Sequence, residues 1–100
     1  PMRGRTSRRV KHFPLTPRVS LEPDETGENW LLSVACADRL GLLYDIARVL
    51  AEQGVNLQSA KIMTLGERVE DTFLLNGANL RAAVARAKLE ADLLKTISRN

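Results

Sequence analysis

The residues best suited to chemistry lie in the segment DRLGL at positions 38–42, between two apolar stretches. A strand is predicted to end just before this segment and a helix to begin at Leu42, which leaves the first helical N–H groups without an intrahelical acceptor. A helix N-terminus favours an anion, and Gly41 lets a ligand approach the backbone closely. Asp38 could hold an ammonium group and Arg39 a carboxylate, so the segment matches a zwitterionic amino acid. In the alternative, structural interpretation, Asp38 caps the helix and Gly41 serves only the backbone.

No other group of residues has the composition of a catalytic or metal site. The sequence contains one histidine, His12, and one cysteine, Cys36. No cluster of histidine, cysteine and carboxylate has metal-ligand spacing, and no serine has a histidine nearby to activate it. Gly41 belongs to neither a GxGxxG motif nor a P-loop. We therefore predict no catalytic residue, metal or cofactor in this chain, and we predict that Cys36 packs in the core.

The charge distribution separates an N-terminal arm from the remainder. The chain has 100 residues and a net charge of +3, yet residues 1–18 contain six basic residues and no acidic one. We interpret residues 1–16 as a basic irregular arm or linker, residues 17–97 as one domain and residues 98–100 as a tail. No apolar run approaches the roughly 18 residues of a membrane span. A lone cysteine does not indicate an oxidising compartment, so we expect a cytoplasmic protein without membrane contact.

The elements that must position the segment are predicted from hydrophobic periodicity. Strands over 18–22 and 30–37, joined by a turn, form an antiparallel hairpin. Apolar residues at helical spacing predict a helix over 42–53, ended by Gly54. Its core stripe is predicted to be Leu43, Ile46, Ala47 and Leu50, with Leu42 and Val49 beside them.

The second half of the chain repeats the strand and helix pattern. Strands are predicted over 57–65 and 69–76, and Asn79 is a suitable N-cap for a final helix. The stripe of that helix is predicted to be Leu80, Val84, Ala87, Ala91 and Leu94. The order ββαββα predicts an α+β, ferredoxin-like fold. It consists of a four-stranded antiparallel sheet, in the spatial order first, second, fourth, third, with two helices on one face.

The motif Asp-Arg-x-Gly-Leu-Leu at 38–43, followed by a helix and by Gly-Val-Asn-Leu at 54–57, resembles the ACT domain. That family consists of ferredoxin-like regulatory modules that sense amino acids, and its commonest motif has proline where this chain has leucine. The resemblance implies ligand-binding residues at these positions: Asp38, Arg39, Leu40, Gly41, Leu42 and Asn56.

A narrower resemblance covers most of residues 10–97. The run AKIMTLGERVEDTF at 60–73 and the lead-in at 10–19 are similar to the last ACT repeat of a family of bifunctional bacterial enzymes. Those enzymes add UMP to the PII protein from UTP with Mg²⁺ when glutamine is scarce, and remove it when glutamine is plentiful. The resemblance implies a sensor of glutamine or another small amino acid, which acts on PII only through the catalytic domains of a parent enzyme.

A second ACT domain is the expected partner, because the predicted strand 57–65 would form an exposed sheet edge. That partner would be a second copy or the preceding repeat. Two alternatives remain open from the sequence: the ACT domain of a stringent-response alarmone synthetase/hydrolase, and a nucleic-acid-binding ferredoxin-like module. Nucleic-acid binding is the less favoured, because such modules stack bases on sheet aromatics, whereas Tyr44 falls in a helix and Phe73 in the core stripe.

Overall fold

A computed structural model describes residues 16–99, so most of the predicted basic arm lies outside the described residues. The elements along the chain are β1 (Arg18–Pro23), β2 (Trp30–Ala37), α1 (Leu42–Glu52), β3 (Asn56–Lys61), β4 (Thr64–Leu65), β5 (Arg68–Asn76), the 3-10 turn η2 (Ala78–Arg81) and α2 (Ala83–Ile97).

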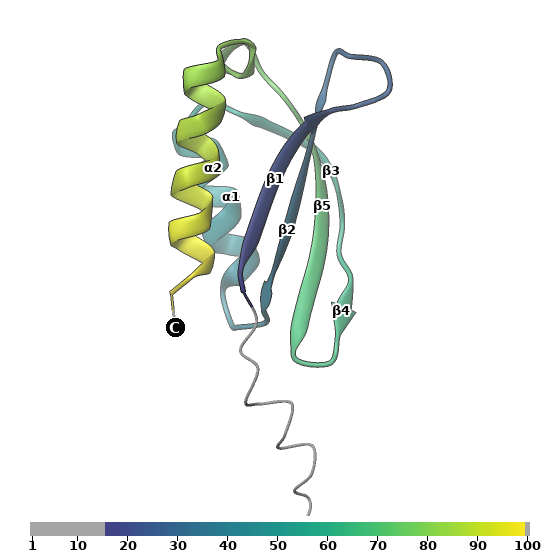
Figure 1. The fold of residues 1–100 in the computed structure, drawn as a ribbon, viewed down its shortest axis with the longest axis vertical. Helices are drawn as coiled ribbons and strands as arrows, with labels where there is room; N and C mark the ends of the chain where they lie inside the picture. The colour runs from purple at the N-terminus through teal and green to yellow at the C-terminus, as the bar shows by residue number, and fades with distance from the viewer. Residues whose placement is uncertain (1–15, 100) are drawn as a thin grey trace, which may run out of the picture.

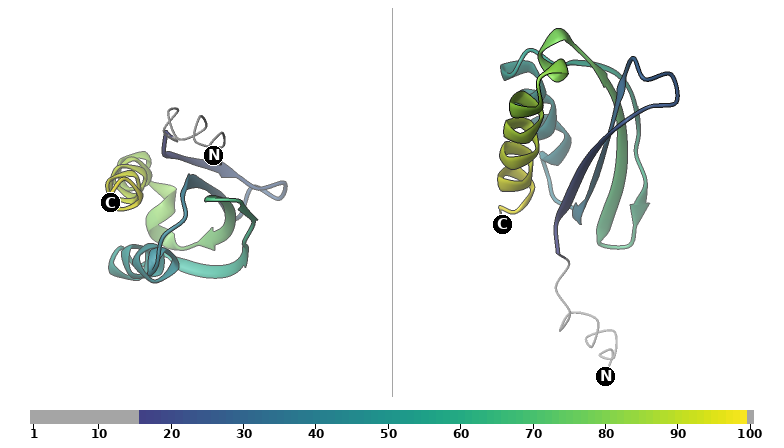
Figure 2. Two further views of the ribbon diagram at one scale, coloured as in Figure 1. Left: turned by 90° about the horizontal axis from the view of Figure 1, so that it is seen from below. Right: turned by 45° about the horizontal axis from the view of Figure 1, so that its top comes forward.

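The strands form one antiparallel sheet in the order β1-β2-β5-β3, with β4 paired to β5 alongside β3. Both helices cover the same face of this sheet (Figure 1), and the view from below separates the helix layer from the sheet layer (Figure 2). The predicted α+β ferredoxin-like arrangement and the predicted strand order are therefore confirmed.

The core lies between the sheet and the two helices. Alternate residues of β2 and β5 face the helices, as the period of two in a half-buried strand requires. The buried apolar residues are Leu32, Val34, Cys36, Leu42, Ile46, Val49, Leu50, Val55, Val69, Phe73, Leu75, Leu80, Leu89, Leu93 and Ile97. The prediction that Cys36 packs in the core is confirmed, and burial, more than any nearby charge, raises the pKa of its thiol.

The predicted continuous strand over 57–65 is wrong, because the edge strand is interrupted between β3 and β4. The register against β5 shifts between Leu57 and Ser59. Farther along, the Met63 N–H donates to the Asp71 carboxylate over 3.1 Å, while the Met63 carbonyl accepts from the Glu70 N–H over 2.8 Å. A side chain thus replaces a backbone acceptor at this point, and the sheet gains a fifth, two-residue strand.

The predicted cap of the last helix is also wrong, and of its predicted stripe only Leu80, which lies in η2, is buried. Asn79 does not cap α2; its amide donates to the Gln53 carbonyl over 2.8 Å. The chain is extended at Ala82, with φ −92° and ψ 129°, so α2 begins anew at Ala83. This break resets the helical phase, and α2 buries Leu89, Leu93, Thr96 and Ile97, whereas Val84 is 80% exposed.

Helix α1 is rotated slightly from the predicted stripe. Its buried residues are Leu42, Ile46, Val49 and Leu50, whereas Leu43 is 45% exposed. Gly54 ends the helix as predicted, with φ +70° and its N–H donating to the Ala51 carbonyl. The rotation matters for the site, because it turns Leu43 out of the core.

Candidate functional site

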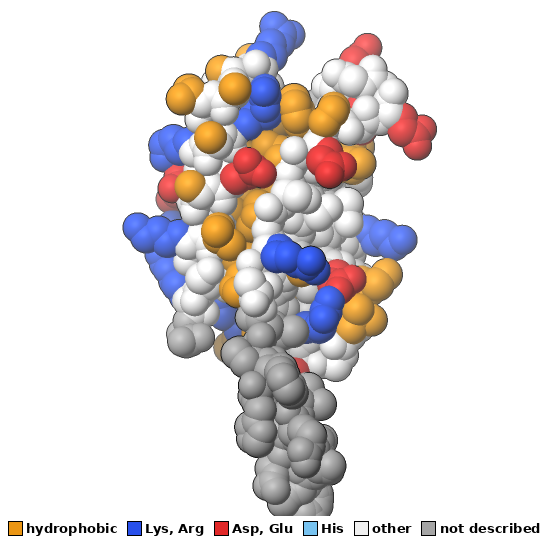
Figure 3. All heavy atoms as spheres, viewed as in Figure 1, with side chains coloured by type: hydrophobic (Ala, Val, Ile, Leu, Met, Phe, Trp, Pro, Cys, Tyr) orange, Lys and Arg blue, Asp and Glu red, His pale blue; other side chains and the backbone are white. Residues whose placement is uncertain are grey.

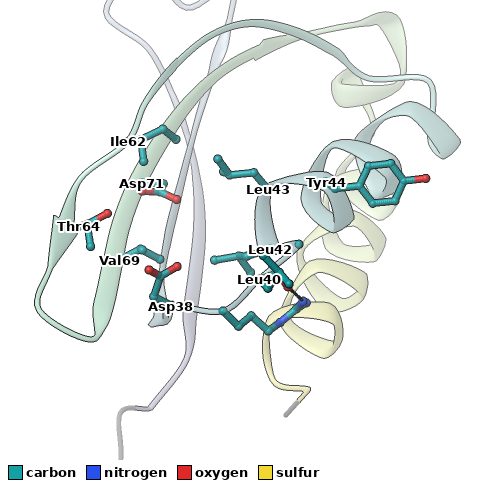
Figure 4. A pocket seen from close by; sticks show the side chains of 11 residues that line it. Asp38, Leu40, Leu42, Leu43, Tyr44, Ile62, Thr64, Val69 and Asp71 are labelled. Carbon is teal, nitrogen blue, oxygen red and sulfur yellow. Dashed lines mark hydrogen bonds between the residues drawn. The ribbon is translucent and has the colours of Figure 1, made fainter.

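A cleft of about 470 Å³ opens where the N-terminus of α1 faces β4 and β5 (Figure 4). It brings together five of the six sequence-predicted ligand residues, all from the loop before α1 and its first turn. Its lining residues are Asp38, Arg39, Leu40, Gly41, Leu42, Leu43, Tyr44, Ile62, Thr64, Val69 and Asp71.

The N-terminus of α1 offers backbone donors to this cleft. Gly41 is the N-cap residue and has φ +80°, a left-handed conformation that glycine adopts without a steric penalty. The Leu42 N–H, predicted to be free, donates to the Arg39 carbonyl over 3.3 Å. Within residues 16–99, no backbone carbonyl accepts from the N–H of Leu43 or Tyr44. Two donors in the first turn therefore remain for an anion, reinforced by the helix dipole.

Asp38 does not cap this helix, so the structural alternative for it is wrong. No side chain among residues 16–99 caps α1. The Asp38 backbone N–H donates to the Glu67 carbonyl over 2.8 Å, which fixes the loop against the β4–β5 turn. Its carboxylate points into the cleft from the same side as Asp71 (Figure 4). Asp38 is therefore held where it can meet a ligand.

The Arg39 guanidinium is engaged within the domain. One nitrogen lies 2.8 Å from the Asp45 carboxylate and 3.3 Å from the Thr96 carbonyl, and the other lies 3.3 Å from the Leu40 carbonyl. These bonds tie the loop to the first turn of α1 and to the last turn of α2. Within residues 16–99, the Nε of Arg39 is buried without a hydrogen-bond partner. The arginine thus positions the cleft through its two terminal nitrogens.

Asp71 is a residue of the cleft that the ligand prediction omitted. It is only 2% exposed, and its Oδ1 accepts from the Met63 N–H. Its Oδ2 is buried and has no hydrogen-bond partner among the described residues 16–99. Burial raises the pKa of the Asp71 carboxyl, and the nearby charge of Asp38 raises it further, against the opposing Met63 bond. One feature of the sequence could have indicated Asp71: it is an acidic residue within the apolar stripe of Val69, Phe73 and Leu75.

Asn56, the sixth predicted ligand residue, does not line the cleft. It begins β3 and pairs with Asn76, beyond the C-terminal end of α1. Helix α1 has 11 residues, which is a length of roughly 16 Å. Within one chain the loop and Asn56 therefore stand at opposite ends of the helix.

The fold and the loop together point to one family, and comparison with family models decides it. The model described as ACT domain matches residues 30–93. The chain belongs to the ACT domain family. The matched region of this ACT domain runs from the start of β2 into α2 and contains every residue that lines the cleft.

Curated relatives of this ACT domain are much longer proteins. A bifunctional uridylyltransferase/uridylyl-removing enzyme of Aromatoleum aromaticum is 56% identical over 97% of the chain. Enzymes of the same name from Nitrosospira multiformis and Burkholderia vietnamiensis are 50% and 54% identical over 97% and 98% of it. The chain spans only 11% of the length of each. No solved structure matches it.

We also examined the described residues 16–99 of the ACT domain for a metal site, a membrane-spanning helix and a surface for RNA bases. Residues 16–99 contain no group of histidine, cysteine and carboxylate side chains that could hold a metal ion. No helix in that range is long and apolar enough to cross a membrane. Its three aromatic residues are Trp30, Tyr44 and Phe73, and Phe73 is buried against the helices. An aromatic platform for RNA bases on the open sheet face is therefore lacking in the described range.

Proposed function

We propose that this chain is the amino-acid-sensing regulatory domain of a bifunctional uridylyltransferase/uridylyl-removing enzyme, and that its ligand is glutamine. The observation that carries the proposal is identity of 50–56% over nearly the whole chain to enzymes of that name. The alarmone synthetase alternative has no comparable support, since the curated relatives reported above all carry the uridylyltransferase name.

The cleft supports an α-amino acid as the ligand class. The free N–H groups of Leu43 and Tyr44 offer a place for a carboxylate. Asp38 and Asp71 supply negative charge for an ammonium group. The carboxylate is bound by the helix N-terminus in this proposal, because the Arg39 guanidinium is already paired with Asp45.

In the parent enzyme, the domain would report glutamine to catalytic domains that add UMP to PII from UTP with Mg²⁺ or remove it. Those domains, and not this one, would hold the metal and the reacting groups. We place this activity in the cytoplasm, in keeping with a single buried cysteine, Cys36.

Isothermal titration and thermal melts with glutamine, glutamate and serine test the ligand. A ligand at 100 times its Kd stabilises the folded state by about 2.7 kcal/mol, which raises Tm by roughly 10–20 °C for a domain of this size. We expect glutamine to produce this shift, and Asp38→Ala to reduce it. No heat and no shift with glutamine well above ~1 mM, where binding would still stabilise measurably, would contradict the proposal.

The second ACT domain would dock on the β3–β4 edge. Every residue of β3 and β4 is exposed, and hydrophobic side chains gather over β4 (Figure 3). The exposed apolar residues of this edge and its interruption are Leu57, Ile62, Met63 and Leu65. Light scattering at rising concentration tests whether two copies associate. Leu57→Lys, which lies outside the cleft, is expected to weaken association, and an equally monomeric wild type would exclude the homodimer.

A further inference from the structure

We infer that the buried carboxylate of Asp71 is a ligand-specificity residue that binds the α-ammonium group of the amino acid. This inference rests on the function proposed above and assigns one end of the ligand within the same cleft. It starts from an anomaly of the fold, since Asp71 is 2% exposed and its Oδ2 has no hydrogen-bond partner in the part of the chain that the structure describes.

Only one carboxylate oxygen of Asp71 takes part in a hydrogen bond within the fold. Oδ1 accepts from the Met63 N–H at the interruption between β3 and β4. An uncharged asparagine could accept that bond equally well through its amide oxygen. The second oxygen is left buried and unpaired, which costs stability. The strand interruption therefore does not account for a carboxylate at this position.

The surroundings of Asp71 call for a cation. Asp38 also lines the cleft, and its charge raises the pKa of Asp71. Among the lining residues, the one basic side chain is Arg39, and its guanidinium is bonded to Asp45, Thr96 and Leu40. An ammonium group beside Oδ2 would satisfy the orphaned acceptor and offset the two negative charges at once.

The N-terminus of α1, where an anion is favoured, lies across the cleft from Asp71. Side chains of β5 project toward the N-terminus of α1, where Leu43 extends from the first helical turn into the same cavity (Figure 4). An anion at that terminus and a cation at Asp71 would share one short ligand, as in an α-amino acid. Leu43 and Ile62 are 45% and 46% exposed. Exposed side chains change rotamer within nanoseconds, and we expect the ligand to reach Oδ2 during such changes.

The test pairs a change in the protein with a change in the ligand. Calorimetry measures the binding of L-glutamine and of glutaramic acid, which is glutamine without its α-amine, to wild type and to Asp71→Asn. A charge-assisted bond of this kind is worth roughly 10- to 100-fold in Kd. Wild type is expected to prefer glutamine by about that factor, and Asp71→Asn to lose the preference by weakening glutamine alone.

Glu70→Gln is the matched control, because it removes one acidic charge from the neighbouring residue of β5, whose side chain points to the other face. It is expected to bind both ligands as wild type does. Asp71→Asn that still discriminates the two ligands would overturn the inference while leaving glutamine binding intact. A wild type that binds neither ligand would overturn the proposed function, and the inference with it.

A second measurement needs no variant. The carbon-13 shift of the Asp71 carboxyl, followed against pH by NMR, reports its pKa with and without saturating glutamine. A bound ammonium group stabilises the carboxylate, so the pKa is expected to fall on binding. A pKa that stays unchanged at saturation would refute the contact, even if Asp71→Asn failed to fold.

Discussion

Arg39→Met tests whether the arginine of the motif is a structural tie between the two helices. The substitution keeps an apolar side chain of similar length and removes the guanidinium. The bonds lost are the 2.8 Å ion pair with Asp45 and the two 3.3 Å bonds to the carbonyls of Thr96 and Leu40. The side chains of Arg39 and Asp45 are 24% and 22% exposed, so the pair lies between the surface and buried regimes.

The magnitude follows from those bonds. An exposed ion pair contributes roughly 0.2–1 kcal/mol to stability, and breaking a fully buried pair costs roughly 3–5 kcal/mol. The contribution of this half-buried pair should lie between these two values. The two long carbonyl bonds add about 0.5 kcal/mol each, the low end of the range for a hydrogen bond. We therefore expect a loss of about 2 kcal/mol in the free energy of unfolding, or roughly 8–16 °C in Tm.

Urea denaturation followed by circular dichroism and by the fluorescence of Trp30 measures this loss. Arg48→Met is the matched control, because Arg48 pairs with Glu52 on the surface of α1, where the two side chains are 42% and 59% exposed. That pair is worth only about 0.3–0.5 kcal/mol. Equal stability of the two variants would refute the structural role of Arg39. Its guanidinium would then be available to contact a ligand.

Three further predictions concern stability. Asp71→Asn is expected to gain about 1–3 kcal/mol at neutral pH, because it removes a buried unpaired charge. Because the pKa of Asp71 is raised in the folded state, protonation of its carboxyl stabilises the folded wild type. In urea titrations across pH, the stability gained by Asp71→Asn should therefore shrink as the pH falls through the folded-state pKa toward 3.8. A gain that is independent of pH would contradict the burial argument. Gly41→Ala is expected to cost about 1 kcal/mol through its φ of +80° alone, because a Cβ there meets nothing within 4 Å; a neutral result in a thermal melt would contradict it. Gly54→Ala is expected to lower the melting temperature more than Gly27→Ala, because a Cβ at position 54 would lie 2.9 Å from the Asn79 amide and a Cβ at position 27 would meet nothing within 4 Å. Equal melting temperatures of the two variants would show that this contact does not destabilise the fold.

Most of the fold could be predicted because its signals are local. The apolar runs of β2 and β5 could be predicted as strands over almost their observed bounds, and Gly54 ends α1 where the helical period ends. The strand order followed from the element order, because an N-terminal strand fills the position left vacant in a ferredoxin-like sheet. The loop at 38–42 could be predicted as the candidate site for a similar reason, since the first N–H groups of a helix have no acceptor within the helix.

Only the tertiary structure decided what each side chain of the site faces. Asp71 and the Met63 N–H meet across two strands, so the break in the edge strand and the orphaned oxygen are not visible in either segment alone. Arg39 was predicted as a ligand contact, yet the Thr96 carbonyl that holds it lies 57 residues away in the sequence. Local sequence signals were enough for the order of most elements, for the family resemblance and for the loop that forms one wall of the cleft. Long-range packing decided its charge, because the guanidinium is paired inside the domain while two carboxylates remain in the cleft.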